Sequence, residues 1–97
     1  MQNKSANLHF SLEWRGVEID GRYDRQPFNN RSDRVYLNGS QPLFADGDRY
    51  LVIWFGPLED TLPADSLIAL SELWLDEAAE TRGLHPDDLK RRQLPLL

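Results

Sequence analysis

The strongest constraint on the fold is a strict alternation of apolar and polar residues on both sides of Arg15 and Gly16. The positions that share one face are Leu8, Phe10, Leu12, Trp14, Val17, Ile19, Gly21 and Tyr23. A period of two is typical of strands with one buried face. If Arg15 and Gly16 form a two-residue turn, opposed residues have numbers that sum to 31, which pairs apolar positions throughout and sets Gly21 beneath the ring of Phe10. The sequence therefore predicts a β-hairpin over residues 8–23.

The same register sets like charges against each other on the outer face of the hairpin. Glu13 lies opposite Glu18, with Asp20 diagonal to Glu13. Opposed like charges destabilise a sheet by a few tenths to roughly 1 kcal/mol. We favour screening by Arg15, Arg22 or water as the explanation, and a bound cation or a basic partner residue is the alternative.

Turn signals divide the next part of the chain. Residues 24–33 have no periodicity and predict a loop. Residues 34–37 predict a short strand that ends in a turn at Asn38 and Gly39, and residues 40–44 suggest a brief return strand. Pro42 restricts that return strand to a sheet edge, because proline cannot donate a ladder hydrogen bond.

Residues 50–55 are apolar at every position and follow a turn signal at Asp46 and Gly47. A short, continuous apolar run between turns is typical of a strand that is covered on both faces. We therefore expect this strand to be central in the sheet.

From Pro63 onward the apolar period changes to that of a helix. The predicted apolar arc contains Leu67, Leu70, Trp74 and Ala78, flanked by Ile68, Ser71, Leu75 and Ala79. Pro63 suits a first helical position, Asp60 and Thr61 are candidate caps, and Gly83 is a natural terminator, with Leu84 as its hydrophobic contact. His85 is expected to make a local capping contact, and a second, short helix is expected between it and Pro95.

These elements predict an α+β fold. We expect an antiparallel sheet of four to five strands, followed by a long helix packed on one face and a short C-terminal helix. Residues 1–7 are expected to form a flexible N-terminal tail, and residues 8–97 a single α+β domain. There is no apolar run of the roughly 18 residues needed to span a membrane, and the N-terminus lacks the apolar segment of a signal peptide. We therefore expect a cytoplasmic protein that does not enter membranes.

The residue types argue against catalysis. The 97 residues include no Cys and two His, which excludes a thiolate nucleophile or zinc site and leaves little for a histidine metal centre. Glycine-rich phosphate loops, nucleophile elbows and zinc-protease motifs are absent from the sequence. We expect no catalytic residues, no metal, no cofactor and no enzyme activity.

The charge distribution points instead to a protein partner. The net charge is −5, and residues 51–97 hold nine acids and four bases while residues 1–50 hold seven of each. The predicted long helix carries an acidic stripe beside one exposed leucine: Asp65, Glu72, Leu73, Asp76, Glu77 and Glu80. The leading hypothesis is a small acidic non-enzymatic protein-interaction module, of the inhibitor, immunity, antitoxin or accessory type, that binds a basic protein through this helix face. Nucleic-acid mimicry, with carboxylates in place of phosphates, is a special case.

Three alternatives remain open. The Arg/aromatic segment 22–36 suggests a nucleic-acid-binding domain with Arg25, Phe28, Arg31 and Arg34 on its surface, although neighbouring Asp residues and the acidic net charge oppose phosphate binding. The three leucines near the C-terminus (residues 94, 96 and 97) need cover, either from their own domain or in a homodimer. The third is an enzyme or small-ligand site on the acidic outer face of the hairpin, which a cation bound at Glu13, Glu18 and Asp20 or a deep pocket near His9 would support.

Overall fold

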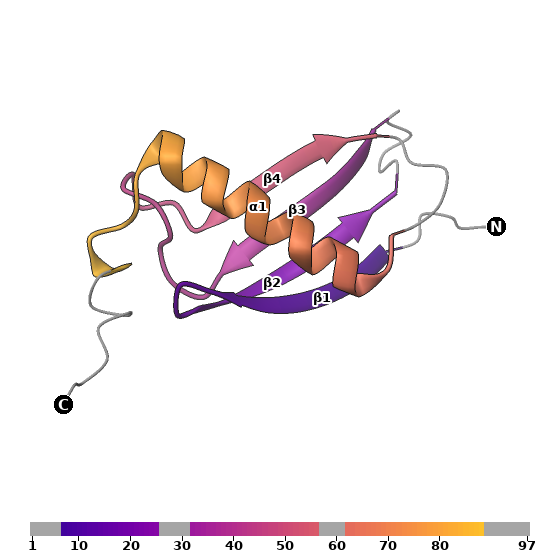
Figure 1. The fold of residues 1–97 in the computed structure, drawn as a ribbon, viewed down its shortest axis with the longest axis horizontal. Helices are drawn as coiled ribbons and strands as arrows, with labels where there is room; N and C mark the ends of the chain where they lie inside the picture. Colours follow the sequence, from indigo (N-terminus) through magenta and orange to yellow (C-terminus); the bar gives the residue numbers. More distant parts are fainter. Residues whose placement is uncertain (1–6, 26–31, 57–61, 89–97) are drawn as a thin grey trace.

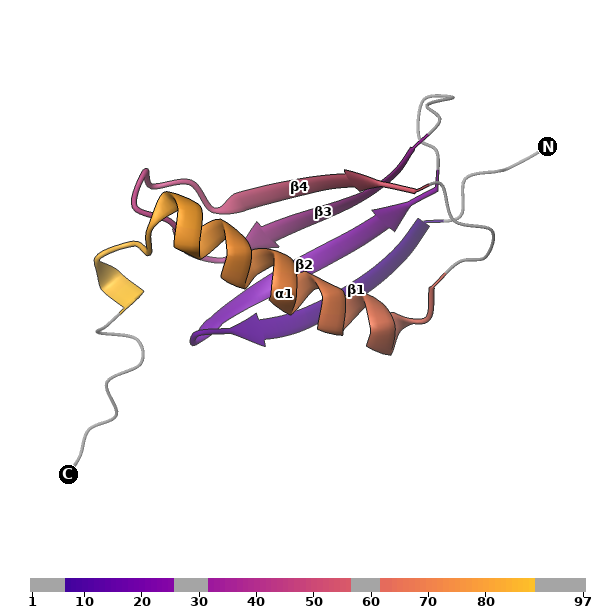
Figure 2. The same cartoon turned by 45° about the horizontal axis from the view of Figure 1, so that its top comes forward.

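The computed structural model describes residues 7–25, 32–56 and 62–88. Two layers make up the fold: a four-stranded antiparallel sheet and one long helix that crosses a single face of it (Figures 1 and 2). The strands are β1 (Asn7–Trp14), β2 (Val17–Asp24), β3 (Asp33–Gly39) and β4 (Tyr50–Phe55), and the helix is α1 (Ala64–Arg82). The strand order β1-β2-β3-β4 is that of a meander. The predicted α+β class is confirmed, with four strands in the described part of the chain.

The predicted hairpin is confirmed residue by residue. Every β1–β2 pair, from Leu8 with Tyr23 to Trp14 with Val17, follows the expected register. Arg15 and Gly16 both have positive φ angles, of 50° and 82°, which is the geometry of a type I′ turn and matches the right-handed twist of the two strands.

The core lies between the sheet and α1. Its fully buried apolar residues are Val17, Ile19, Tyr23, Val35, Leu37, Leu43, Phe44, Leu67 and Leu75. The predicted apolar arc of the helix is confirmed, but its centre runs along Leu67, Ser71 and Leu75, while Leu70 and Trp74 are only partly buried. Each fully buried leucine contributes on the order of 1.5–3 kcal/mol, so these contacts hold α1 to the sheet.

The ends of α1 follow the sequence signals closely. Pro63 precedes the first helical residue by one position, in extended conformation, and makes no side-chain cap. Gly83, with φ 83°, ends the helix and donates its N–H to the carbonyl of Ala79 at 2.8 Å. The candidate caps Asp60 and Thr61 lie outside the described residues.

The connection between β3 and β4 differs from the prediction. Asn38 and Gly39 do not form a turn, because β3 continues through Gly39, whose N–H donates to the Arg49 carbonyl at 2.8 Å. A side chain at position 39 would meet Leu43 at 2.9 Å, so glycine is needed here for close packing. The expected return strand over residues 40–44 is not formed. The β-pairing of this segment is limited to an isolated bridge between Phe44 and Leu84. The predicted turn at residues 46 and 47 is confirmed, since the Gly47 N–H donates to the Phe44 carbonyl at 2.8 Å.

The expectation that residues 50–55 form a central strand is wrong. The bounds of β4 are as expected, but it is the last strand of the order and therefore an edge. Tyr50, Val52 and Trp54 are 37%, 42% and 47% exposed. The physical reason is that α1 covers one face of the sheet only, so an uninterrupted apolar run here reflects one packed and one open face.

Some predictions concern residues near the two ends of the chain, beyond the residues that the structure describes. Asn7, expected in the tail, is the first residue of β1, and residues 1–6 are not described. His85 makes the expected local capping contact, since its Nδ1 accepts from the Asp87 N–H at 3.1 Å. The rest of the predicted C-terminal helix and its leucines (residues 89–97) lie outside the described residues. No helix in the described ranges combines the length and apolar character needed to cross a bilayer.

Candidate interaction surfaces

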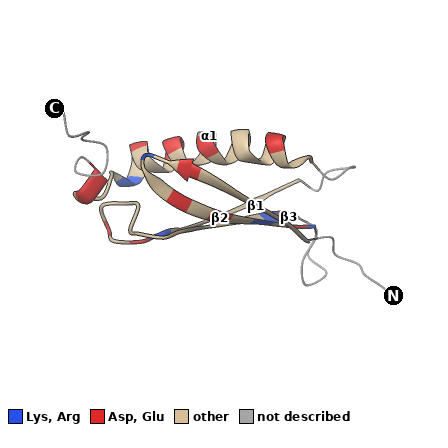
Figure 3. Cartoon of the chain, turned by 90° about the horizontal axis from the view of Figure 1, so that it is seen from below, with Lys and Arg blue, Asp and Glu red and all other residues tan. Residues whose placement is uncertain are grey.

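The acidic helix face is the outward side of α1. We use that name for Asp65, Glu72, Leu73, Asp76, Glu77 and Glu80, all of which are exposed. Figure 3 shows the Asp and Glu positions in red at intervals along α1. Leu73, at 60% exposure, is the most exposed of the large apolar side chains that the structure describes. The six residues predicted as a partner-binding set therefore share one accessible surface.

One member of this face also has a structural contact. The Oδ1 atom of Asp76 accepts a hydrogen bond of 2.9 Å from Nε1 of Trp14, whose side chain is buried at the end of β1. Beside it, Arg15 donates to both carboxylate oxygens of Asp88 at 2.8 and 3.0 Å. The hydrogen bond to Asp88 raises the pKa of Arg15 above its ordinary value. These contacts tie α1 and the segment after it to the first hairpin, so the acidic helix face is presented on a fixed support.

The open face of the sheet is the second surface. It consists of the outward side chains of the four strands, with β1 and β2 contributing polar residues and β3 and β4 contributing aromatic ones. Glu13 stands opposite Glu18 as predicted. In the described part of the chain no three His, Asp or Glu side chains come together as a metal site would require. Both of the opposed glutamates are exposed.

Arginine side chains lie over the aromatic rings of the open face. Arg22 stacks on Tyr36 with 5.6 Å from its Cζ atom to the ring centroid, and Arg34 stacks on Trp54 at 5.5 Å. Arg49 lies over Tyr50 at 5.7 Å. Such contacts keep the guanidinium groups close to the rings and contribute on the order of 0.5–1 kcal/mol each at exposed sites.

A buried carboxylate balances two of these arginines. Asp24 is 3% exposed and accepts from Arg22 Nε at 3.1 Å and from Arg34 Nη2 at 2.5 Å. Arg34 is one of the four residues predicted as a secondary surface, and its charge is largely matched here. Arg25 is half-buried, and Phe28 and Arg31 lie outside the described residues. The Arg/aromatic cluster that the structure does assemble draws on β4 as much as on residues 22–36.

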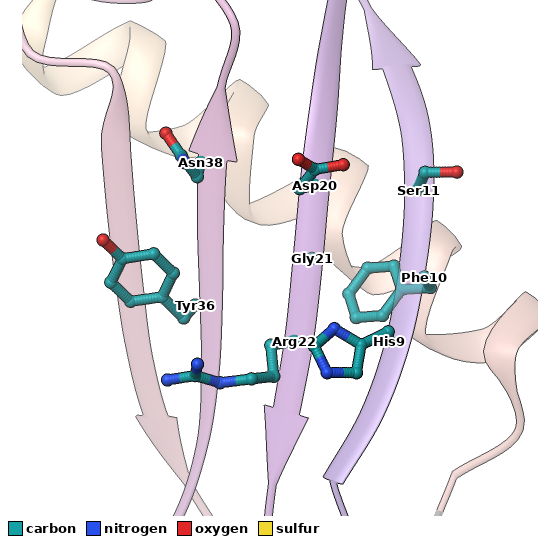
Figure 4. Close-up of a pocket in the computed structure, with 8 residues that line it drawn as sticks. All are labelled: His9, Phe10, Ser11, Asp20, Gly21, Arg22, Tyr36 and Asn38. Carbon is teal, nitrogen blue, oxygen red and sulfur yellow. The ribbon is translucent and has the colours of Figure 1, made fainter.

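A shallow depression of about 570 Å³ lies on the open face over β1, β2 and β3 (Figure 4). Its lining consists of His9, Phe10, Ser11, Asp20, Gly21, Arg22, Tyr36 and Asn38. General acid–base catalysis by His9 requires a second group that orients the imidazole and positions a substrate. In the described ranges no carboxylate makes that contact with His9. The depression therefore offers polar side chains, among them His9, Asp20 and Arg22, that a ligand could contact.

Sequence reasoning missed the aromatic part of the open face. Tyr36, Tyr50 and Trp54 belong to it, and the last two were expected under a second layer. A usable signal was present, because the sequence contains one long amphipathic helix and a single helix covers one face of a sheet.

Comparisons with protein-family models, curated proteins and solved structures found no match. The two surfaces described above are therefore the basis for a functional proposal.

Proposed function

We propose that this chain is a small, acidic, non-enzymatic protein-interaction module that binds a basic protein through the acidic helix face. The observation that carries the proposal is the accessibility of all six residues of that face, five carboxylates around the 60%-exposed Leu73, on one helix. Carboxylates accelerate encounter with a basic surface, and a central apolar side chain supplies contact area once the partners meet.

Electrostatics within α1 support this proposal. Glu72, Asp76 and Glu80 are spaced by one helical turn, so each repels the next by a few tenths of a kcal/mol. The helix contains one base, Arg82, and that residue is paired with Asp46 at 2.7 Å and Asp48 at 3.2 Å instead. A basic partner would relieve this repulsion. Partners of this kind are bound by inhibitor, immunity, antitoxin and accessory proteins, and a cytoplasmic location is part of the same proposal.

The test is capture of partners from the source lysate with matched charge variants. The first variant carries Glu72→Gln, Glu77→Gln and Glu80→Gln on the acidic helix face. The second carries Glu13→Gln, Glu18→Gln and Asp20→Asn on the open face, and so removes the same number of exposed carboxylates.

The wild-type chain and the open-face variant are expected to retain the same basic protein at low salt. The helix variant is expected to bind it at least about tenfold more weakly, which corresponds to about 1.4 kcal/mol. Equal retention by both variants would refute the proposed surface. Competition by duplex DNA for the captured protein would identify the mimicry case.

A nucleic-acid-binding function is the second candidate, and the stacked arginine–aromatic pairs of the open face favour it. Single-strand binders combine cationic groups with rings on which bases stack. The pairing of Asp24 with Arg22 and Arg34 and the net charge of −5 oppose it. The test is a titration of the wild type and of Trp54→Phe with single- and double-stranded oligonucleotides at low salt. Binding is monitored by Trp fluorescence. A lack of saturable quenching would eliminate this candidate.

A further inference from the structure

The β4 edge of the sheet lacks the features that usually prevent strand addition. Edge strands expose unpaired N–H and C=O groups, and proteins protect them with charges, prolines or bulges. The six residues of β4 are uncharged and contain no proline. Each of them pairs with one residue of β3 without a break, from Phe55 opposite Asp33 to Tyr50 opposite Asn38, so there is no bulge.

A groove runs along this edge between β4 and α1. Its volume is about 480 Å³, and it is lined by residues 51–54 of β4 and by Trp74, Glu77, Ala78 and Thr81 of α1. Figure 1 shows β4 as the outermost strand, on the opposite side of the sheet from β1. On the open face the same strand presents Tyr50, Val52 and Trp54, all between 37% and 47% exposed. The open-face side of the β4 edge is therefore apolar and accessible, while the groove on the other side combines apolar residues with Glu77 and Thr81.

We propose that β4 is a dimerisation strand, which pairs antiparallel with β4 of a second copy about a two-fold axis perpendicular to the sheet. In the register that we infer, Val52 lies opposite Val52 of the second copy. Tyr50 then faces Trp54 of the second copy on the open face, and Leu51 faces Ile53 on the core face. The product is a continuous eight-stranded sheet with both α1 helices on the same side.

The symmetry of the strand favours a second copy as the occupant. Antiparallel pairing about Val52 keeps each residue on its own face, because paired residues have numbers of the same parity. The pairs formed by residues 50–54 are apolar on both faces, and Phe55 lies opposite Arg49 of the second copy. β4 itself contains no charged residue, so none of its own side chains opposes a like charge. Arg49 and Arg34, which lie over Tyr50 and Trp54, come near each other on the open face of the interface. A two-fold interface needs this kind of self-complementary patch.

The size of the patch sets the expected strength. A stable interface buries about 800 Å² per partner. Three half-exposed side chains and a six-residue strand edge supply less than that, so we expect a dimer with a dissociation constant on the order of 1–100 μM. The proposal does not depend on the acidic helix face. Of its six residues, Glu77 lines the groove beside β4, and the other five are not part of that lining.

The first test measures solution mass by sedimentation velocity over a concentration series that spans this range. The wild-type mass is expected to rise from one chain to two. Val52→Lys sets two ammonium groups opposite each other and is expected to stay monomeric throughout, with an unchanged thermal transition at low concentration. His9→Lys places the same charge on the other edge strand and is expected to dimerise like the wild type.

The second test uses the absence of cysteine from the chain. Directly opposed residues of an antiparallel pair have Cα atoms about 4.5–5.5 Å apart, within the range that a disulfide spans. Val52→Cys is therefore expected to form a covalent dimer under mild oxidation, and Ser11→Cys on β1 is expected to remain monomeric. A wild-type chain that stays monomeric, a dimer that survives Val52→Lys, or equal cross-linking of the two cysteine variants would each overturn the proposal. Monomeric chains that bind an extended segment of another protein along β4 would also overturn it.

Discussion

The two faces of the sheet are built from the same four strands, yet they differ in what their residues do. On the packed face, side chains such as Val35 and Leu37 are fully buried beneath α1. On the open face, Tyr36 and Trp54 are larger, yet Tyr36 is partly accessible and Trp54 is exposed, and an arginine lies over each ring. The difference follows from the position of one helix, since both faces contain aromatic residues and carboxylates.

This comparison separates stability from surface chemistry. Substitutions on the packed face remove buried area or hydrogen bonds that water cannot replace, so they act on folding. Substitutions on the open face leave the core intact, so they are expected to change binding at that face and not the free energy of unfolding. If the separation holds, a substitution on the packed face should lower stability far more than a matched substitution on the open face.

The largest difference is expected between a core leucine and an open-face valine. Leu75→Ala removes a fully buried side chain of α1 and is expected to lower the free energy of unfolding by about 2–5 kcal/mol. Val52→Ala, on the open face, is expected to change it by no more than about 0.5 kcal/mol at a concentration where the chain is monomeric. Urea unfolding followed by far-UV circular dichroism measures both. Similar losses at the two positions would abolish the distinction between the faces.

The next effect concerns the polar pair inside the packed face. Tyr23 donates to Asp33 Oδ2 at 2.7 Å, and both residues are fully buried. Tyr23→Phe removes this charge-assisted hydrogen bond and is expected to cost about 1.5–3 kcal/mol. Tyr36→Phe, on the open face, is expected to cost far less, because the ring contacts remain.

The same pair predicts a dependence on alkaline pH. Burial, and then the hydrogen bond to Asp33, raise the pKa of the Tyr23 hydroxyl well above its ordinary value. Its contribution to stability is therefore complete below the unfolded pKa of about 10 and is lost as the pH rises above it, because the unfolded chain then releases a proton that the folded chain keeps. The alkaline loss of stability should be smaller in Tyr23→Phe than in the wild type and unchanged in Tyr36→Phe. An identical decline in all three proteins would contradict the assignment.

A steric prediction follows for Gly21. A Cβ atom added there would lie 2.4 Å from the ring of Phe10 on the packed face. Gly21→Ala is therefore expected to destabilise the fold by about 1–3 kcal/mol. Adding Phe10→Leu should recover part of this loss, so the effects of the two substitutions should not be additive. Strict additivity would mean that the ring does not limit the residue at position 21.

The smallest effect is expected at the periphery of the packed layer. The hydrogen bond from Arg82 lowers the pKa of the exposed Asp46 carboxyl. Its contribution is present above the unfolded pKa of about 4 and is lost as the pH falls through the lower folded value. Asp46→Asn should therefore show a slightly shallower loss of stability below about pH 4 than the wild type. Once Arg82→Gln is present, adding Asp46→Asn should have a smaller effect, because only backbone hydrogen bonds, chiefly that from the Asp48 N–H, then lower the pKa of the Asp46 carboxyl.

The sequence predicted local structure well where two independent patterns agreed. The turn at Arg15 and Gly16 and the alternation on both sides of it specify one register, and the structure has that register. Pro63 and Gly83 bracket α1 in the same way. At Asn38 and Gly39 a single local signal was overridden, because Gly39 is needed for packing against Leu43 and its N–H bonds to Arg49.

The parts that sequence reasoning missed depend on contacts between distant residues. The Trp14–Asp76 hydrogen bond joins residues 62 positions apart, and the Arg15–Asp88 pair joins residues 73 positions apart. Neither has a periodicity that could reveal it. The edge position of β4 was missed for a related reason, since an apolar run is the same whether a strand has cover on both faces or on one.

The placement of α1 after all four strands has a consequence for synthesis of the chain. On a ribosome, the strands emerge first, and about forty residues separate Leu37 from Leu75, a helix residue of the same buried cluster. At 5–20 residues per second this interval lasts roughly 2–8 seconds. During that time the apolar side chains of the nascent sheet are uncovered. Those of β4 are included, because β4 also precedes α1 in the chain. The unfinished chain is therefore expected to be a chaperone client until α1 has been made and has docked.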